Sequence, residues 1–166
     1  MVTNPQATDF YTILQSIQTR LVEVTKLDPT YVRIVASDNY KYDFEVSMIT
    51  IRPLGPEPST NAGGGRQARP ERRNIRVYCN IRSSLDQVGK DDVALRNLFT
   101  LENTINDALD EFYPNINGQN LTIEPLHPVD GGNQPPIREP NDDIGEIFSL
   151  LNYEVVFVRP NSIPQP

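Results

Sequence analysis

The apolar residues of the first segment recur at helical spacing. Between residues 8 and 26 they fall three or four positions apart and form one apolar stripe. Thr8 suits the N-cap position, where a side-chain oxygen accepts a hydrogen bond from a free backbone N–H. Asp28-Pro29 ends the element, because a residue before proline avoids the helical region. We therefore expect an amphipathic helix over residues 8–26.

A second helix is predicted to run from Asp91 or Asp92, either of which suits the N-cap, to Phe112. Its apolar residues again follow helical spacing, and Pro114 stops it. The carboxylates of this helix fall mostly off the apolar stripe, so we expect them on its solvent face. They are Glu102, Asp107, Asp110 and Glu111.

Strands are predicted where apolar and polar residues alternate. The clearest is Asn74–Arg82, in which every second residue from Ile75 to Ile81 is apolar and the others are polar. This pattern is typical of a sheet with one face in the core. The other predicted strands are Tyr31–Val35, Tyr42–Ile51, Leu121–Glu124 and Asn152–Val158.

Two long stretches lack any such pattern. Residues 52–73, the arm, hold four prolines, four glycines and five arginines, with Leu54 as the only large aliphatic residue. This composition buries too little apolar surface to fold alone, so we expect the arm to be mobile in an isolated monomer. Residues 125–146 form a second irregular loop that leads into one helical turn near Ile147–Leu151, and residues 159–166 form a tail.

The order of these elements predicts a single α+β domain over residues 1–166. We expect a mainly antiparallel sheet of about five strands, with both helices packed on one face of it. The strands on either side of the arm would pair as a hairpin, with the arm as its long extended loop.

The charges are unevenly distributed. The net charge of −7 argues against a general nucleic-acid binder. Six arginines lie between Arg66 and Arg82 against the single acid Glu71, whereas acids dominate from Ser83 to Val158. Complementary head-to-side contacts between copies would use such a division. A solvated basic loop balanced by acidic neighbours would produce it equally well, and both interpretations stay open.

Targeting and redox signals are absent from the sequence. The amino terminus has no basic region followed by an apolar run, and no apolar stretch approaches the roughly 20 residues of a membrane span. We therefore expect a soluble protein made in a cytoplasm. Cys79 is the only cysteine, which excludes an internal disulfide, and its place in an alternating strand predicts a small buried hydrophobe.

No motif supplies catalytic chemistry. Gly63–Gly65 lacks the Lys-Ser/Thr of a phosphate loop, and Ser83-Ser84 lacks a nucleophile elbow and a paired base. His127 has no second histidine or cysteine pair beside it, and the spacing of Asp130, Asp142 and Asp143 matches no calcium loop. We expect a loop histidine, no enzyme activity, no cofactor and no metal.

The arginines of the arm admit three interpretations. Arg66, Arg69, Arg72 and Arg73 could bind carboxylates at a protein interface, belong to an inert mobile loop, or grip phosphates. No aromatic side chains are interleaved with them, which weakens the third interpretation. We favour protein contact.

The order of elements resembles that of the tail terminator (tail-completion) proteins of tailed bacteriophages, relatives of the neck and head–tail connector proteins. The resemblance rests on the opening helix ending in Ile17–Leu21, on Ile75–Arg82 with Gly89–Leu95 leading into the second helix, and on the closing strand Tyr153–Val158. It is a pattern of elements and carries over no individual functional residue.

The resemblance implies a structural virion protein of the tail or neck, assembled in the host bacterial cytoplasm. Such proteins form a ring, usually hexameric, that caps the tail tube, ends its polymerisation and docks to the head–neck connector. The implied partners are copies of itself, the tail tube protein and the connector protein, with the tail sheath added in contractile tails. DNA passes through the lumen without specific binding.

Two sets of residues are then candidates for interaction sites. We expect Arg66, Arg69, Arg72 and Arg73 to contact neighbouring subunits or the tube, and the loop around Asp142 and Asp143 to form a counter-surface. A head-closure, connector or other neck ring protein is the alternative within the same class. A small nucleic-acid-binding module using the arginine-rich arm is the alternative of a different class.

Overall fold

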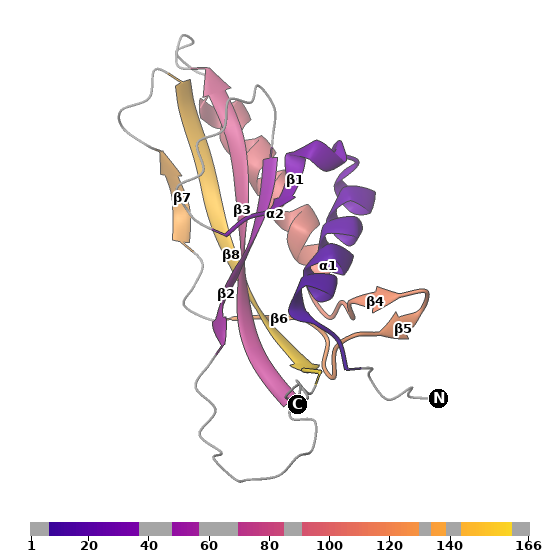
Figure 1. Ribbon diagram of the computed structural model, residues 1–166. Helices are drawn as coiled ribbons and strands as arrows, with labels where there is room; N and C mark the ends of the chain where they lie inside the picture. The colour runs from indigo at the N-terminus through magenta and orange to yellow at the C-terminus, as the bar shows by residue number, and fades with distance from the viewer. Residues whose placement is uncertain are drawn as a thin grey trace.

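The computed structural model describes residues 7–36, 48–56, 70–84, 91–129, 134–138 and 144–160. They form an α+β fold in which a mixed sheet makes one layer (Figure 1). The helices α1 (Phe10–Thr25) and α2 (Asp91–Leu109) make the other layer, on one face of the sheet. The predicted fold class and the placement of both helices are confirmed. No helix in these ranges combines the length and the apolar character needed to cross a membrane.

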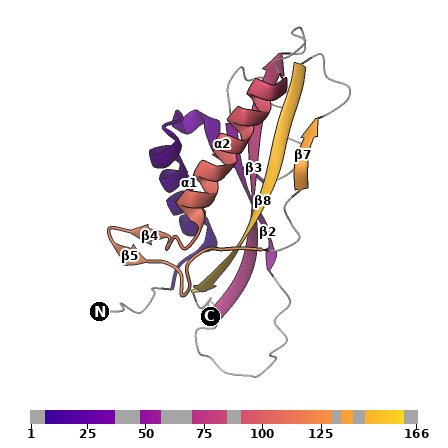
Figure 2. The same ribbon diagram turned by 180° about the vertical axis from the view of Figure 1, so that it is seen from behind.

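The sheet has six strands in the described part of the chain, in the order β1-β2-β3-β8-β6, with β7 also paired to β8 (Figure 2). Only β1 and β2 are parallel; the other pairs are antiparallel. The strands are β1 (Val32–Ile34), β2 (Met48–Pro56), β3 (Pro70–Ser84), β6 (His127–Pro128), β7 (Gln134–Arg138) and β8 (Ile144–Val158). The short 3₁₀ turn Pro29–Tyr31 leads into β1.

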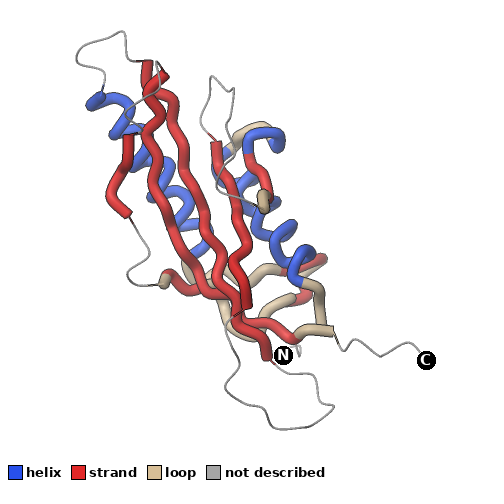
Figure 3. The backbone as a smooth tube through the Cα atoms, turned by 60° about the vertical axis from the view of Figure 1, so that its left-hand side comes forward, coloured by secondary structure: helices blue, strands red, loops and turns tan. Residues whose placement is uncertain are grey.

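The centre of the sheet is the ladder between β3 and β8. Both strands are 15 residues long, and they pair along their whole length, from Pro70 with Val158 to Ser84 with Ile144. In Figure 3 these strands run in front of α2, so that this view looks onto the face of the sheet that carries no helix. The ladder fixes the two central strands as one stiff unit.

The core lies between the sheet and the helices. One stripe of α1, from Ile13 to Leu21, is buried there. So is one stripe of α2, formed by Ala94, Leu98, Ile105, Ala108 and Leu109. The inward residues of β3 (Ile75, Val77, Cys79) pack against them. Cys79 has no exposed surface, so its predicted role as a small buried hydrophobe is confirmed.

The start of α1 differs from the prediction. Asp9, not Thr8, is the N-cap: its carboxylate accepts hydrogen bonds from the backbone N (3.0 Å) and the hydroxyl (2.7 Å) of Thr12. These bonds lower the pKa of Asp9. Thr8 donates through its backbone N to the carbonyl of Val158, which ties the helix start to the end of β8.

The predicted hairpin across the arm is confirmed, but the arm is shorter than expected. β2 extends to Pro56 and β3 begins at Pro70, so both ends of residues 52–73 are strand, and residues 57–69 lie outside the described residues. Prolines are tolerated here because of where they sit. The carbonyl of Ile51 accepts a hydrogen bond from the backbone N of Val35, so the peptide groups of Ile51 point toward β1. Peptide groups alternate in direction along a strand, so the nitrogen of Pro53 points to the same edge. Since β1 has ended there, the missing N–H of Pro53 costs no hydrogen bond of the sheet.

Three other predicted elements were wrong. Leu121–Glu124 forms bends and not a strand; it follows a hairpin of β4 (Asn115–Ile116) and β5 (Gln119–Asn120). The helical turn near Ile147–Leu151 is part of β8. The loop 125–146 contains β6 and β7.

Candidate functional site

The sheet has one apolar and one arginine-bearing face. On β3, Ile75 and Val77 point to the helices, so Arg72 and Arg76 point to the opposite face. Strand register extends this face across the neighbouring strands, because paired residues share a side. Arg52 pairs with Arg76, and Arg33 pairs with Thr50, which pairs with Tyr78. We name the set Arg33, Arg52, Arg72 and Arg76 the arginine face.

The arginine face is held by a few specific contacts. Arg76 donates through Nε to Asn152 Oδ1 (3.1 Å) on β8, and Arg33 donates to the carbonyl of Thr30 (2.7 Å). Arg72 Nη1 lies 3.3 Å from Glu154 Oε1, and its side chain is 55% exposed. Glu154 is a carboxylate that β8 places on this face, and the arginines outnumber it among the residues whose side chains are described.

The helix layer carries the opposite charge. Asp107, in the last turn of α2, and Asp110 and Glu111, just beyond the helix, are exposed, whereas Ile105 and Leu109 are buried against the sheet. We name Asp107, Asp110 and Glu111 the acidic rim. The arginine face and the acidic rim therefore lie on opposite layers of one body. The predicted solvent position of these carboxylates is confirmed.

The predicted arm residues are divided by the structure. Arg72 belongs to the arginine face, but Arg73 points to the helix side of the sheet, where its Nε donates to Glu71 Oε1 (2.5 Å). Its guanidinium lies 5.0 Å above the ring of Phe10, which stacks on Phe157 at 5.2 Å. Arg73 thus braces the start of α1 against the sheet. Arg66, Arg69, Asp142 and Asp143 lie outside the described residues.

The titratable groups of the core are not set up as nucleophiles. Burial raises the pKa of the Cys79 thiol to about 12, with Glu102 adding to the shift and the hydroxyl of Ser149 opposing it. Burial also raises the pKa of Tyr153, whose hydroxyl donates to Asn106 Oδ1 (2.5 Å). Both groups are therefore protonated near pH 7.

The histidine lies at the sheet edge. His127 was predicted in a loop, but it belongs to β6 and pairs with Glu154 of β8. Its side chain is about half exposed, and Nε2 lies 4.0 Å from Glu124 Oε2. Across the described ranges no three His, Cys, Asp or Glu side chains gather as a metal site would require.

Sequence reasoning missed two features of the surface. Arg33 lies between Val32 and Ile34, which face the core, so the alternation of β1 would have placed it on the opposite face. Asn117-Gly118 joins β4 and β5 with positive φ at both residues (50° and 79°). An Asn-Gly pair between short strands is a strong hairpin signal.

The sequence matches no protein-family profile, and no curated protein matches it significantly. One solved structure, whose printed name describes no function, is similar to this chain with a TM-score of 0.45. The two are 15% identical, and the match covers 93% of this chain and 100% of the other. A likeness of this size supports no argument about function.

Proposed function

We propose that this chain is a structural virion protein, one subunit of a usually hexameric ring that caps the tail tube of a bacteriophage. The ring ends tube polymerisation and docks to the head–neck connector. The observation that supports this proposal is the opposite charge of the two layers, with the arginine face on the sheet and the acidic rim on the helices. The resemblance in the order of elements supplies the tail as the setting.

A closed ring needs two different, complementary surfaces on each subunit. Its contacts are head-to-tail, so one patch of a subunit meets a different patch of the next, and the same contact repeats around the ring. The arginine face of one copy and the acidic rim of the next provide such a pair. Opposite charges of this kind steer subunits together and fix their register.

The stiff body suits this role as well. The ladder of β3 and β8 runs the full length of both strands, and two helices pack against it. It therefore holds the two charged surfaces in a fixed position relative to each other. We assign Arg66 and Arg69 to contacts with a neighbouring subunit or the tube, and Asp142 and Asp143 to the counter-surface. The net charge of −7 favours passage of DNA through the lumen over binding to it.

The proposal is tested by the mass and shape of the full-length protein, alone and with tail tubes. Light scattering and negative-stain images should show a closed ring in solution or at one tube end. Arg72→Glu should weaken assembly, and adding Asp107→Arg should restore part of it, while Arg96→Glu on the exposed side of α2 serves as the control. A wild-type chain that stays monomeric alone and with tubes would contradict the proposal.

Nucleic-acid binding is the second candidate, favoured by one observation. Tyr78 lies among the arginines on the same face of the sheet, and aromatic and basic side chains together can bind single strands. In that case the full-length protein would be retained on DNA in a salt-dependent way. Arg72→Ala combined with Arg76→Ala would remove this retention. Retention equal to that of the Arg96→Ala variant would contradict this second candidate.

A further inference from the structure

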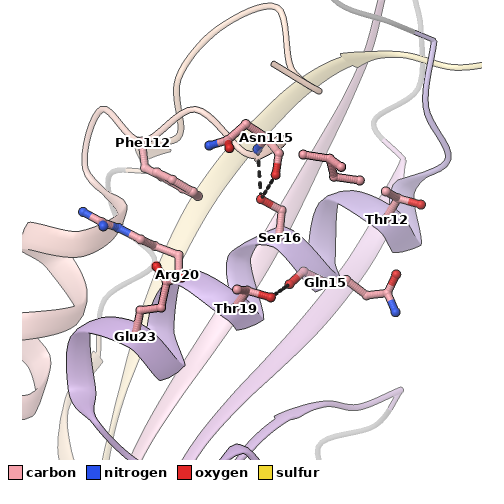
Figure 4. Close-up of a pocket in the computed structure, with 9 residues that line it drawn as sticks. Thr12, Gln15, Ser16, Thr19, Arg20, Glu23, Phe112 and Asn115 are labelled. Atoms are coloured by element: carbon pink, nitrogen blue, oxygen red, sulfur yellow. Dashed lines mark hydrogen bonds between the residues drawn. The ribbon is translucent and has the colours of Figure 1, made fainter. Parts of the chain in front are cut away.

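A groove lies between α1 and the chain that follows α2 (Figure 4). It consists of two hollows of about 380 and about 410 Å³ that share Arg20, Phe112 and Asn115. Thr12, Ser16 and Thr19 line the first hollow, and the acidic rim lines the second. Arg20 is therefore common to a hydroxyl-lined and a carboxylate-lined hollow.

The guanidinium of Arg20 is held on one side only. Its Cζ lies 5.4 Å from the ring centroid of Phe112, and its Nε donates a long hydrogen bond of 3.4 Å to the carbonyl of Ala108. The two Nη groups form no hydrogen bond or ion pair with any residue of the described ranges. A planar fork of donors is thus fixed in place and left unused.

The hydroxyl groups of the first hollow have already used their donors, since that of Thr12 donates to Asp9 (2.7 Å). The hydroxyl of Ser16 donates to the carbonyl of Asn115 (3.1 Å) and accepts from its backbone N (2.9 Å). The hydroxyl of Thr19 donates to the carbonyl of Gln15 (2.9 Å). Arg20 therefore offers the charged donors that a ligand of this groove would meet.

The surroundings of Arg20 select the kind of anion. Glu23, Asp107 and Glu111 line the same groove and would repel a polyanion such as nucleic acid. A single carboxylate brings one charge and matches the guanidinium fork with two hydrogen bonds. Ile116 is 47% exposed beside the groove, which gives an apolar surface to a protein segment but not to a free small anion.

A second copy of the chain presents such a carboxylate on the surface that meets the acidic rim in the proposed ring. Glu154 lies within the arginine face, where its side chain is 22% exposed, and within the described ranges its Oε1 is the carboxylate oxygen that is engaged, by Arg72. A carboxylate has lone pairs for further donors, so Oε2 can accept from a second arginine. In the proposed ring the acids of the rim would face arginines, and Arg20 would face Glu154.

We propose that Arg20 binds the Glu154 carboxylate of a neighbouring copy, and that this ion pair sets the register of the ring. The proposal rests on the proposed function, since it assumes the contact between the arginine face and the acidic rim. In this contact the charges are reversed, because a cation beside the acidic rim meets an acid within the arginine face. The ion pair therefore favours one alignment of the two surfaces over others.

A double-mutant cycle on the full-length protein tests the pair. Arg20→Gln and Glu154→Gln should each raise the concentration for half-assembly by about tenfold or more, because each removes one charge of the pair between subunits. The double variant should assemble no worse than either single variant, because the contact is lost only once. Arg96→Gln and Glu124→Gln are the matched controls and should assemble as the wild type does. Arg96 is exposed, and the side chain of Glu124 is 44% exposed.

The outcomes separate this inference from the proposed function. The ion pair would be contradicted if the single variants assembled like the controls. It would also be contradicted if the increase in half-assembly concentration in the double variant equalled the product of the two single increases. Either result would leave the proposed ring standing. A wild-type chain that forms no ring alone or on tubes would contradict both. The melting temperature of every variant, measured below the assembly concentration, shows that a loss of assembly does not arise from unfolding.

Discussion

The hydroxyl of Tyr153 lies 2.5 Å from Asn106 Oδ1 and joins the middle of β8 to α2. Tyr153 has no exposed surface, so this hydrogen bond satisfies a polar group that would otherwise be buried without a partner. The two layers are thus held together by a directional contact inside the apolar core. The bond also fixes α2 along the strand direction of the ladder.

Removing this hydroxyl should destabilise the protein. Tyr153→Phe leaves the half-buried amide of Asn106 without its donor, and we expect the free energy of unfolding to fall by about 1 kcal/mol. Urea denaturation followed by circular dichroism measures the change. Tyr113→Phe is the control, because that side chain is exposed, and it should change stability by less than about 0.5 kcal/mol. Equal effects of the two substitutions would contradict the role assigned to the bond.

The sequence predicted the helices well because each has one buried face. In α1 and α2 the apolar residues follow helical spacing, and the structure buries that stripe against the sheet. The end of β8 was predicted as a strand for the same reason, since Tyr153, Val155 and Phe157 face the core in alternation.

The first half of β8 was misjudged because both of its faces are covered. Ser149, Leu150 and Leu151 are all buried, so the sequence shows a continuous apolar run that fits a helix as well as a strand. The prolines at the ends of the arm misled in the opposite direction. Pro53 and Pro70 looked like loop residues, but an edge position and a strand start both tolerate a missing N–H.

The candidate surfaces depended on pairing, which the sequence does not show. Alternation along each strand can place Arg33 and Arg76 opposite the core, but only the register shows which arginines of β1 and β2 lie beside those of β3. The groove at Arg20 needs α1 and the chain after α2 to lie side by side. Neither relation is local in sequence.

Alkaline pH should destabilise the fold through Cys79. Burial raises the pKa of this thiol from 9.0 to about 12, so the unfolded chain loses the proton first as the pH rises. The stability is complete below about pH 9 and falls between pH 9 and pH 12, by at most about 1.4 kcal/mol per pH unit for one group. Urea denaturation at pH 7.5, 9 and 10 measures this slope.

Cys79→Ala separates the thiol from other groups that titrate in the same range. This variant should be less stable at pH 7.5 because it leaves a small cavity, but its stability should decline less between pH 9 and pH 10 than that of the wild type. Parallel declines in the two proteins would rule out the thiol as the source.

The two neighbouring arginines of β3 should behave differently. Arg73→Ala removes a half-buried guanidinium that stacks on Phe10 and pairs with Glu71, and it should cost about 1–2 kcal/mol of stability. Arg72→Ala removes an exposed ion pair with Glu154 and should cost less than about 0.5 kcal/mol. Thermal or urea unfolding of the two variants measures this contrast. The same two proteins should show the reverse order in assembly, with Arg72→Ala the more defective, and the opposite result would exclude the arginine face as an interface.

The N-cap of α1 gives a further check on the fold. Asp9→Ala should lower the free energy of unfolding by about 1 kcal/mol, because it removes the acceptor for Thr12. Thr8→Ala should have a smaller effect, since Thr8 bonds through its backbone. The pKa of Asp9 is lowered in the folded state, so its contribution is present at neutral pH and is lost as the pH falls below the usual range of a carboxyl. Denaturation of both variants at pH 7 and pH 3 measures this, and a larger cost for Thr8→Ala would contradict the assignment.

The most direct test of the proposed function is the length of tail tubes grown with and without this protein. Purified tube protein would be polymerised with increasing amounts of the full-length chain, and the tubes imaged by electron microscopy. We expect tubes to stop growing, with an added ring at one end only, and Arg72→Glu to need a higher concentration than Arg96→Glu for the same effect. Tubes that keep growing at saturating protein, with no density added at either end, would contradict the proposed function.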